Sequence, residues 1–88
     1  MVRGVNEAEL RFRRIVGNNL RVAREYAGRS QRDLCEKASI GQAYLSQWES
    51  GKWNIGIDNI VKIARVTGFR PHELLDLDFR RKADRDVA

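Results

Sequence analysis

Cysteine and histidine are scarce in this 88-residue sequence, and each scarcity excludes a class of site. Cys35 is the only cysteine, so neither an intramolecular disulfide nor a cysteine-based metal site is possible. His72 is the only histidine, so a metal ligand or a Cys/His nucleophile lacks partners. No paired acid/base residues and no phosphate-binding glycine loop occur. The sequence therefore predicts that the protein is not an enzyme and uses no metal, cofactor or small-molecule ligand.

Long apolar runs are missing as well. No stretch approaches the roughly 18 apolar residues that cross a bilayer. The first ten residues lack the apolar block of a signal peptide. We therefore expect an intracellular, cytoplasmic protein with no membrane partner.

Positive charge, in contrast, is abundant. Lysine and arginine number 17 against 12 aspartate and glutamate, which gives a net charge of +5 and a pI near 10.0. Most of the excess lies in residues 1–53, which carry ten basic and six acidic residues. A small domain this basic is typical of proteins that bind nucleic acid or another anionic surface.

Apolar periodicity and helix-end signals predict one all-α domain over residues 7–79, with flexible termini at 1–6 and 80–88. The five predicted helices cover residues 7–27, 31–38, 42–49, 57–67 and a short segment that begins at Pro71. Ser30 is a good N-cap for the second helix, with Asp33 placed as in a capping box. Glycines 28, 51 and 68 follow three of the helices, where a left-handed residue is common.

The buried face of each helix can be predicted from the same spacing. In the first helix the expected stripe runs through Phe12, Val16, Leu20, Ala23 and Ala27, widened by Ile15, Val22 and Tyr26. In the fourth and fifth helices the residues expected to be buried are Ile57, Ile60, Val61, Ala64, Leu74 and Leu75.

Residues 31–38 and 42–49 are two short helices joined by a three-residue corner, which is the pattern of a helix-turn-helix. The side chains expected in the seam between them and the rest of the domain are Leu34, Ala38, Ile40, Leu45 and Trp48. Cys35 would lie where the two helices approach most closely. The outer face of the second helix is then polar, and a helix of this width fits the major groove of DNA.

These motifs resemble the phage lambda repressor and Cro family of regulators, often called the XRE family. The resemblance covers roughly residues 13–76 and rests on the stretches "LRVAREYAGRSQRDLCEKA", "YLSQWESGKWN", "IDNIVKIARVTG" and "PHELL". The stretch around residues 54–64 is similar to the controller proteins of restriction–modification systems. The resemblance implies a lambda-repressor-like five-helix domain that regulates transcription as a homodimer on a palindromic double-stranded DNA operator. Such a protein is nucleoid-associated when bound.

The resemblance also implies roles for individual residues. Base contacts from the recognition helix, about 42–49, are expected from Gln42, Ala43, Ser46 and Gln47. Contacts to the DNA backbone are expected from Gln31, Arg32, Tyr44, Lys52, Trp53 and Asn54. Arg24 and Glu49 match a largely buried ion pair that joins the first helix to the third. We expect the dimer interface at Ile63, Val66, Phe69 and Leu77.

The sequence departs from the family pattern at several of these positions. The corner glycine is Ser39 here, so the turn is expected to be strained or differently shaped. Trp53 replaces a loop residue that is often Arg or Lys, and it either packs over residues 57–67 or lies against the DNA backbone. Cys35 replaces the usual alanine, Trp48 replaces Ile or Val, and Arg70 stands at a cap position usually filled by Ser or Thr.

Structural explanations compete with functional ones for some residues. Cys35 is better explained as a small buried side chain than as a redox sensor, and His72 as a solvated helix residue than as a ligand. Arg24 and Glu49 could also be exposed surface charges. A merely solvated helix face is the competing explanation for Gln42 and Gln47, against which the helix-turn-helix frame argues.

Two explanations fit the basic start of the first helix and the apolar residues near the C-terminus. Arg11, Arg13 and Arg14 either contact DNA or serve solubility. Leu77 and Phe79 either close the core or form a dimer interface. An antitoxin-like protein-binding module of the same fold is the second possible function, although residues 80–88 are short and charged for a partner-binding extension.

Overall fold

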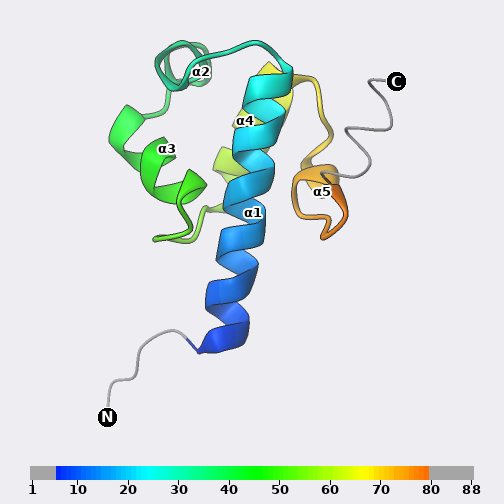
Figure 1. The fold of residues 1–88 in the computed structure, drawn as a ribbon. Helices are drawn as coiled ribbons and strands as arrows, with labels where there is room; N and C mark the ends of the chain where they lie inside the picture. The colour runs from blue at the N-terminus through cyan, green and yellow to red at the C-terminus, as the bar shows by residue number, and fades with distance from the viewer. Residues whose placement is uncertain (1–5, 80–88) are drawn as a thin grey trace.

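The computed structural model describes residues 6–79 of the chain, which contain five helices connected by short turns and loops (Figure 1). The helices are α1 (Glu7–Tyr26), α2 (Gln31–Ala38), α3 (Gln42–Glu49), α4 (Ile57–Thr67) and α5 (Pro71–Leu74). The all-α, five-helix prediction is confirmed, and the predicted bounds of α2, α3 and α4 agree with the structure. The termini predicted to be flexible lie outside the described residues, apart from Asn6.

Local signals in the sequence determine where the helices begin and end. The side chains of Asn6 and Ser30 accept hydrogen bonds from the backbone N–H groups of Glu9 and Asp33, at 2.8 and 3.0 Å. These bonds satisfy donors that a helix start otherwise leaves unpaired. Asn6 is therefore the N-cap of α1 rather than part of a flexible terminus. Gly68 ends α4 with a φ of 88°, a conformation that glycine adopts without steric cost.

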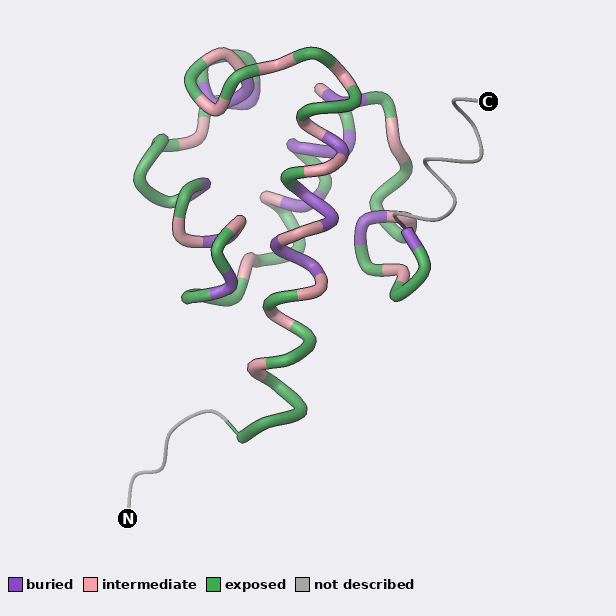
Figure 2. Tube along the Cα trace, viewed as in Figure 1, coloured by how far each residue is buried: buried purple, intermediate pink, exposed green. Residues whose placement is uncertain are grey.

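The core lies where α3, α4 and α5 pack against α1, while α2 packs against α3 and α4. Figure 2 shows that the buried residues of α1 lie in its middle and C-terminal turns, whereas its first turns are exposed. The main core comprises Val16, Leu20, Ala23, Leu34, Cys35, Leu45, Trp48, Ile60, Ile63, Ala64, Leu74 and Phe79. Each large apolar side chain that is fully buried contributes roughly 1.5–3 kcal/mol to folding. None of the helices within residues 6–79 is long and apolar enough to cross a membrane.

The buried face of α4 corrects the sequence prediction. Ile57 is 77% exposed and Val61 is 36% exposed. The residues that face the core are Ile60, Ile63, Ala64 and Thr67, which have the same spacing one turn further along the chain. The sequence prediction missed this stripe because it includes a threonine. The Thr67 hydroxyl donates to the Ile63 carbonyl oxygen at 2.9 Å, so its burial leaves no donor unpaired.

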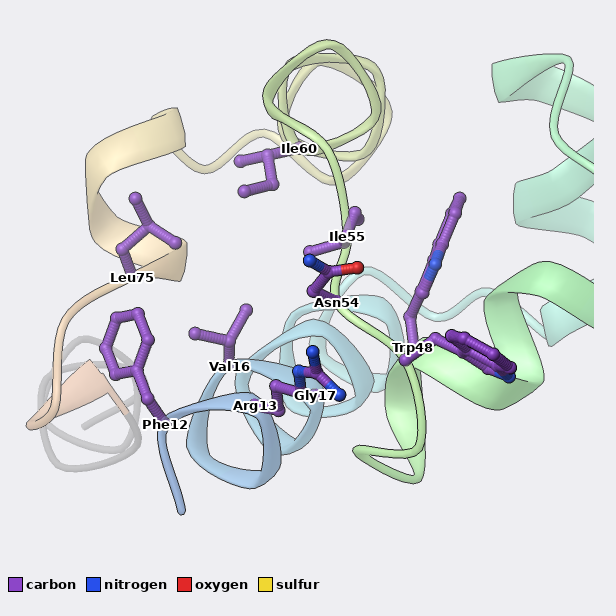
Figure 3. Close-up of a pocket in the computed structure, with 10 residues that line it drawn as sticks. Phe12, Arg13, Val16, Gly17, Trp48, Asn54, Ile55, Ile60 and Leu75 are labelled. Carbon is purple, nitrogen blue, oxygen red and sulfur yellow. The ribbon is translucent and has the colours of Figure 1, made fainter. Parts of the chain in front are cut away.

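Three further side chains that we expected to be buried are partly exposed. Phe12, Tyr26 and Leu75 have exposed fractions of 43%, 47% and 39%. Phe12 and Leu75 line an apolar pocket between α1, the α3–α4 loop and the end of α5, together with Val16, Ile55 and Ile60 (Figure 3). The pocket explains the exposure of Phe12 and Leu75, because no described element covers the side of these residues that faces it.

Asn19 is a buried polar residue that the sequence did not single out. Its exposed fraction is 3%, and its amide nitrogen donates to the carbonyl oxygens of Leu74 and Asp76, both at 2.9 Å. Leu74 is the last residue of α5 and Asp76 follows the helix, where carbonyl groups have no partner within the helix itself. Asn19 therefore attaches α5 to α1 and compensates for the small size of the last helix.

Candidate nucleic-acid interface

The corner between α2 and α3 consists of Ser39, Ile40 and Gly41. Ser39 is left-handed, with φ 58° and ψ 50°, and is the only non-glycine residue with positive φ among those described. A non-glycine residue in this region costs about 1–2 kcal/mol. The strain predicted for a serine at this corner is therefore present, in a conformation that glycine adopts without steric cost. Ile40 packs against the core and Gly41 begins α3.

Helix α3 is divided into a buried side and an exposed side. Leu45 is fully buried and Trp48 is 8% exposed, so both hold the helix against the body of the domain, as predicted. The residues predicted to contact bases lie on the other side: Gln42, Ala43 and Ser46 are exposed and Gln47 is half-buried. The structure thus brings the four predicted residues together on one polar surface of α3.

Gly17 lies where α1 packs closely against the C-terminal end of α3. A Cβ atom at this position would lie 2.9 Å from the carbonyl oxygen of Glu49 and closer still to that of Trp48. Both obstacles are main-chain atoms at the C-terminal end of α3, and they cannot rotate away. The sequence prediction missed this contact, although a glycine within an apolar helical stripe is a signal of close packing.

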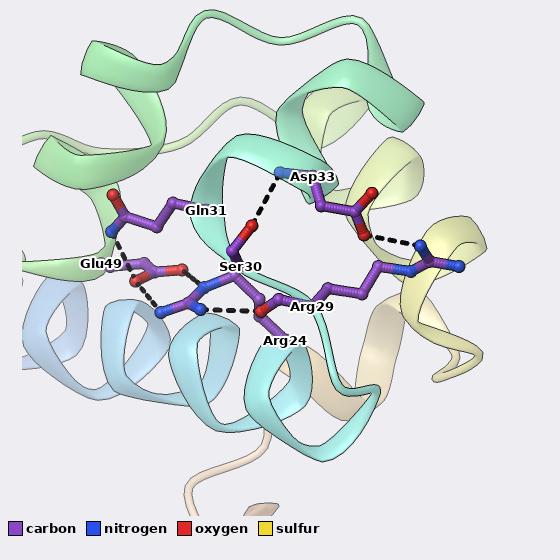
Figure 4. A network of polar contacts seen from close by, with 6 residues as sticks. All are labelled: Arg24, Arg29, Ser30, Gln31, Asp33 and Glu49. Atoms are coloured by element: carbon purple, nitrogen blue, oxygen red, sulfur yellow. Dashed lines mark hydrogen bonds and ion pairs between the residues drawn. The ribbon is translucent and has the colours of Figure 1, made fainter.

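The Glu49 carboxylate joins α1, α2 and α3 (Figure 4). Arg24 on α1 donates from Nε to Glu49 Oε2 at 2.7 Å and from Nη2 to Oε1 at 3.1 Å. Gln31 at the start of α2 donates from Nε2 to Oε1 at 3.0 Å. The third nitrogen of Arg24, Nη1, donates to the carbonyl oxygen of Arg29 at 2.9 Å. One carboxylate therefore fixes the relative positions of three helices.

The pair is largely buried, with side-chain exposures of 12% for Arg24 and 4% for Glu49. The hydrogen bond to Glu49 raises the pKa of Arg24 above its ordinary value, against the opposing effect of burial. Arg24 and Glu49 are therefore a buried ion pair and not two exposed surface charges. Gln31, which we expected to be free for a phosphate, has its amide directed to Glu49 instead, and one amide hydrogen remains.

The loop between α1 and α2 adds a second ion pair to this region. Arg29 Nη1 lies 2.7 Å from Asp33 Oδ2, and Ser30 caps α2 beside it (Figure 4). The capping box expected from Ser30 and Asp33 is thus only half formed, because the Asp33 carboxylate binds Arg29. The first turn of α2 is therefore fixed by the Ser30 cap, by the pair of Asp33 with Arg29 and by the bond of Gln31 to Glu49.

The other predicted backbone contacts are exposed. Arg32 forms only a loose pair with Glu36 at 3.6 Å, with side-chain exposures of 81% and 68%. Tyr44 stacks on Trp48 with ring centroids 6.1 Å apart and is 62% exposed. Lys52, Trp53 and Asn54 form the exposed loop after α3. Trp53 lines the pocket of Figure 3 and is still 58% exposed.

The predicted dimer residues are only partly at the surface. Ile63 is fully buried in the core, so its assignment to an interface was wrong. Val66 and Phe69 are half-buried. Phe69 packs edge-on against Tyr26 and Phe79, with centroids 5.5 and 4.9 Å apart. Of the four, Leu77 alone is largely exposed, at 66%.

Three residues with open roles can now be placed. Phe79 closes the core, with 2% exposure. Cys35 is 6% exposed, and burial raises the pKa of its thiol, as expected for a small core side chain. His72 is exposed on α5. Neither Cys35 nor His72 lies on the polar surface of α3.

Known proteins share this arrangement. The helix-turn-helix family matches residues 20–74. The restriction-modification controller protein C.AhdI from Aeromonas hydrophila is 31% identical, with a TM-score of 0.67 over 70% of this chain and 94% of that one. The hypothetical transcription factor NHTF from Neisseria is 28% identical, with a TM-score of 0.74 over 93% and 94%. Control protein C.BamHI from Bacillus amyloliquefaciens is 38% identical over 47 residues, or 53% of this chain and 58% of that protein.

The sequence matches span 60% of the length of the Neisseria hypothetical transcription factor and 58% of that of C.BamHI, so they cover part of each protein. The relatives are a hypothetical transcription factor and controller proteins, which confirms the predicted XRE-type family, and the prediction of a regulator rather than an enzyme agrees with what these relatives are. The chain belongs to the helix-turn-helix family of DNA-binding transcriptional regulators.

Proposed function

We propose that this protein regulates transcription as a homodimer that binds a palindromic operator, with α3 of each subunit in the major groove. Gln42, Ala43, Ser46 and Gln47 would contact base edges. Glutamine can pair with adenine N6 and N7, and the alanine methyl group can contact a thymine methyl group. Arg32, Tyr44, Lys52, Trp53 and Asn54, with the remaining amide hydrogen of Gln31, would contact the DNA backbone. A protein with this target would act in the cytoplasm, at the nucleoid.

The observation that carries this proposal is the rigid presentation of the polar side of α3. Leu45 and Trp48 hold the helix from inside, and Glu49 is bonded to both Arg24 and Gln31. Binding of a rigid surface avoids much of the ordering cost that a mobile helix would add. The fixed start of α2 would then set the register of α3 relative to the phosphates.

Dimerisation is supported by the size of α3 and by exposed apolar side chains. A helix of eight residues reaches only a few base pairs, whereas two copies related by a two-fold axis would read half-sites about 34–36 Å apart. Ile57, Leu75 and Leu77 remain exposed at 77%, 39% and 66%. Apolar surface of this kind is often covered by a partner subunit.

Selection from a random duplex library tests the proposal. We expect the protein to enrich an inverted repeat with half-site centres about 10 bp apart. Analytical ultracentrifugation should find two protein chains per duplex. A library without an enriched sequence, or a single protein chain bound per duplex, would contradict the proposal.

The base contacts are tested by substitution. Gln42→Ala or Gln47→Ala should each lose roughly 1–3 kcal/mol of discrimination at one base pair and leave binding to mixed-sequence DNA nearly unchanged. His72→Ala, an exposed polar change on α5, is the matched control and should alter neither. Equal weakening on selected and mixed-sequence duplexes would refute the base-reading role.

A further inference from the structure

Two arginines of α1 lie next to the α3–α4 loop. Gly51, the first residue of this loop after the C-cap, is buried, and a Cβ atom there would lie 2.9 Å from Cγ of Arg14. The stem of the Arg14 side chain therefore lies directly against the loop. Arg13 lines the same pocket as Trp53 and Asn54, and Figure 3 shows its side chain on the side of α1 near Asn54. Both arginines are thus adjacent to the segment that contains Lys52.

The charges in this region are not neutralised by the pairs that the structure contains. The ion pairs within residues 6–79 are Arg24–Glu49, Arg29–Asp33 and Arg32–Glu36. None of them uses Arg13, Arg14 or Lys52. The nearest acid to Lys52 along the chain is Glu49, whose carboxylate is already paired with Arg24, and the nearest to the two arginines is Glu9 in the first turn of α1. Two arginines of α1 therefore lie next to the loop that contains Lys52, while Trp53 contributes an aromatic ring instead of a charge.

We propose that Arg13 and Arg14 of α1, together with Lys52, form a second phosphate-binding surface, which we call the α1–loop surface. It rests on the proposed function, because α3 in the major groove directs the loop after it towards the sugar–phosphate backbone at the groove edge. The partner is the phosphate backbone of double-stranded DNA beside the bases that α3 contacts. The surface supplies from α1 the positive charge that Trp53 does not supply in the loop.

Charge removal with the side-chain stem retained is the direct test. Arg13→Gln and Arg14→Gln keep the methylene groups that pack beside the loop, so the melting temperature should stay near that of the wild type. Each lost phosphate contact lowers the salt dependence of log K by about 0.9. Between 50 and 200 mM salt, as assay conditions, each variant should therefore lose about 3.5-fold less affinity than the wild type.

Arg65→Gln is the matched control. Arg65 is exposed in the last turn of α4, at the opposite end of that helix from the loop, and its substitution removes the same charge. Binding is measured by fluorescence anisotropy with the duplex selected by the wild-type protein and with a mixed-sequence duplex of equal length. The two α1 variants should weaken binding to both duplexes by similar factors, because phosphates are present in every sequence.

A neutral methylphosphonate scan of the selected duplex locates the contact. We expect the wild type to lose affinity at one or two phosphates flanking the bases read by α3, and Arg14→Gln to be insensitive at those positions. If the α1 variants match Arg65→Gln in salt slope and keep every methylphosphonate effect, the α1–loop surface is wrong while the DNA-binding proposal stands. If the wild type binds no duplex, both proposals fail.

Discussion

Gly17→Ala sets two known effects of opposite sign against each other. Alanine inside a helix is favoured over glycine by about 1 kcal/mol, so propensity alone predicts a more stable α1. The structure predicts the reverse, because the added Cβ would overlap the Trp48 carbonyl oxygen and lie 2.9 Å from that of Glu49. Overpacking typically costs about 1–3 kcal/mol, and here the obstacle is main chain that only a shift of α3 can move.

Because main chain cannot rotate away, the packing cost should lie in the upper part of that range, about 2–3 kcal/mol, and the expected net result is a loss of about 1–2 kcal/mol in the free energy of unfolding. For a domain of this size, the melting temperature should fall by roughly 5–15 °C. Thermal unfolding followed by far-ultraviolet circular dichroism measures this change. Because α3 would move with Glu49, affinity for the selected duplex should fall as well.

Gly56→Ser is the control for Gly17→Ala. Gly56 has a φ of −77° and precedes α4 as its N-cap, and a Cβ atom added there would have no other atom within 4 Å. Serine is a preferred N-cap, so this variant should be as stable as the wild type or slightly more stable. A Gly17→Ala protein that melts at or above the wild-type temperature would refute the close-packing explanation.

Two further predictions concern buried groups. Glu49→Gln should lower the free energy of unfolding by about 2–4 kcal/mol, because the largely buried Arg24 loses its counter-charge. In a double-mutant cycle measured by urea unfolding, Arg24→Gln should cost much less in the Glu49→Gln background than in the wild type. Additive losses would contradict the pairing. Burial raises the pKa of Cys35, so the native thiol should react slowly with iodoacetamide and the unfolded thiol quickly. Because the folded pKa of Cys35 lies above the ordinary value of 9.0, the stability that the protonated thiol contributes is complete below pH 9.0 and decreases as the pH rises through the folded pKa. Cys35→Ala should lack that decrease, and a pH profile of stability identical to that of the wild type would contradict the assignment.

The helices themselves could be predicted from sequence because their ends are encoded locally. Ser30 caps α2, Pro71 begins α5 and Gly68 ends α4, each within one turn of the boundary that it sets. The polar side of α3 could be predicted from the sequence as well, because Leu45 and Trp48 determine which side of the helix is buried. Short-range chemistry is sufficient for such features.

Features that depend on distant segments could not be predicted in the same way. The residues 57–67 contain two overlapping stripes of helical spacing, and only the contacts of α4 with α1, α2 and α5 select the one with Thr67. Asn19 donates to the carbonyl oxygens of Leu74 and Asp76, which lie 55 and 57 positions further along the chain. The bond from Gln31 to Glu49 likewise spans 18 positions and reassigns an amide that the family pattern reserves for phosphate.

The shared carboxylate of Glu49 also has a consequence for how this sequence can change over time. Replacement of residue 49 alone would leave a guanidinium and an amide unpaired at once, and replacement of residue 24 or 31 alone would leave the carboxylate short of donors. Among descendants of this chain, positions 24, 31 and 49 should therefore vary as a set. No side chain within residues 6–79 is hydrogen-bonded to the side chains of Gln42, Ala43 or Ser46, so these positions should vary independently and, under the proposed function, change the operator that is read.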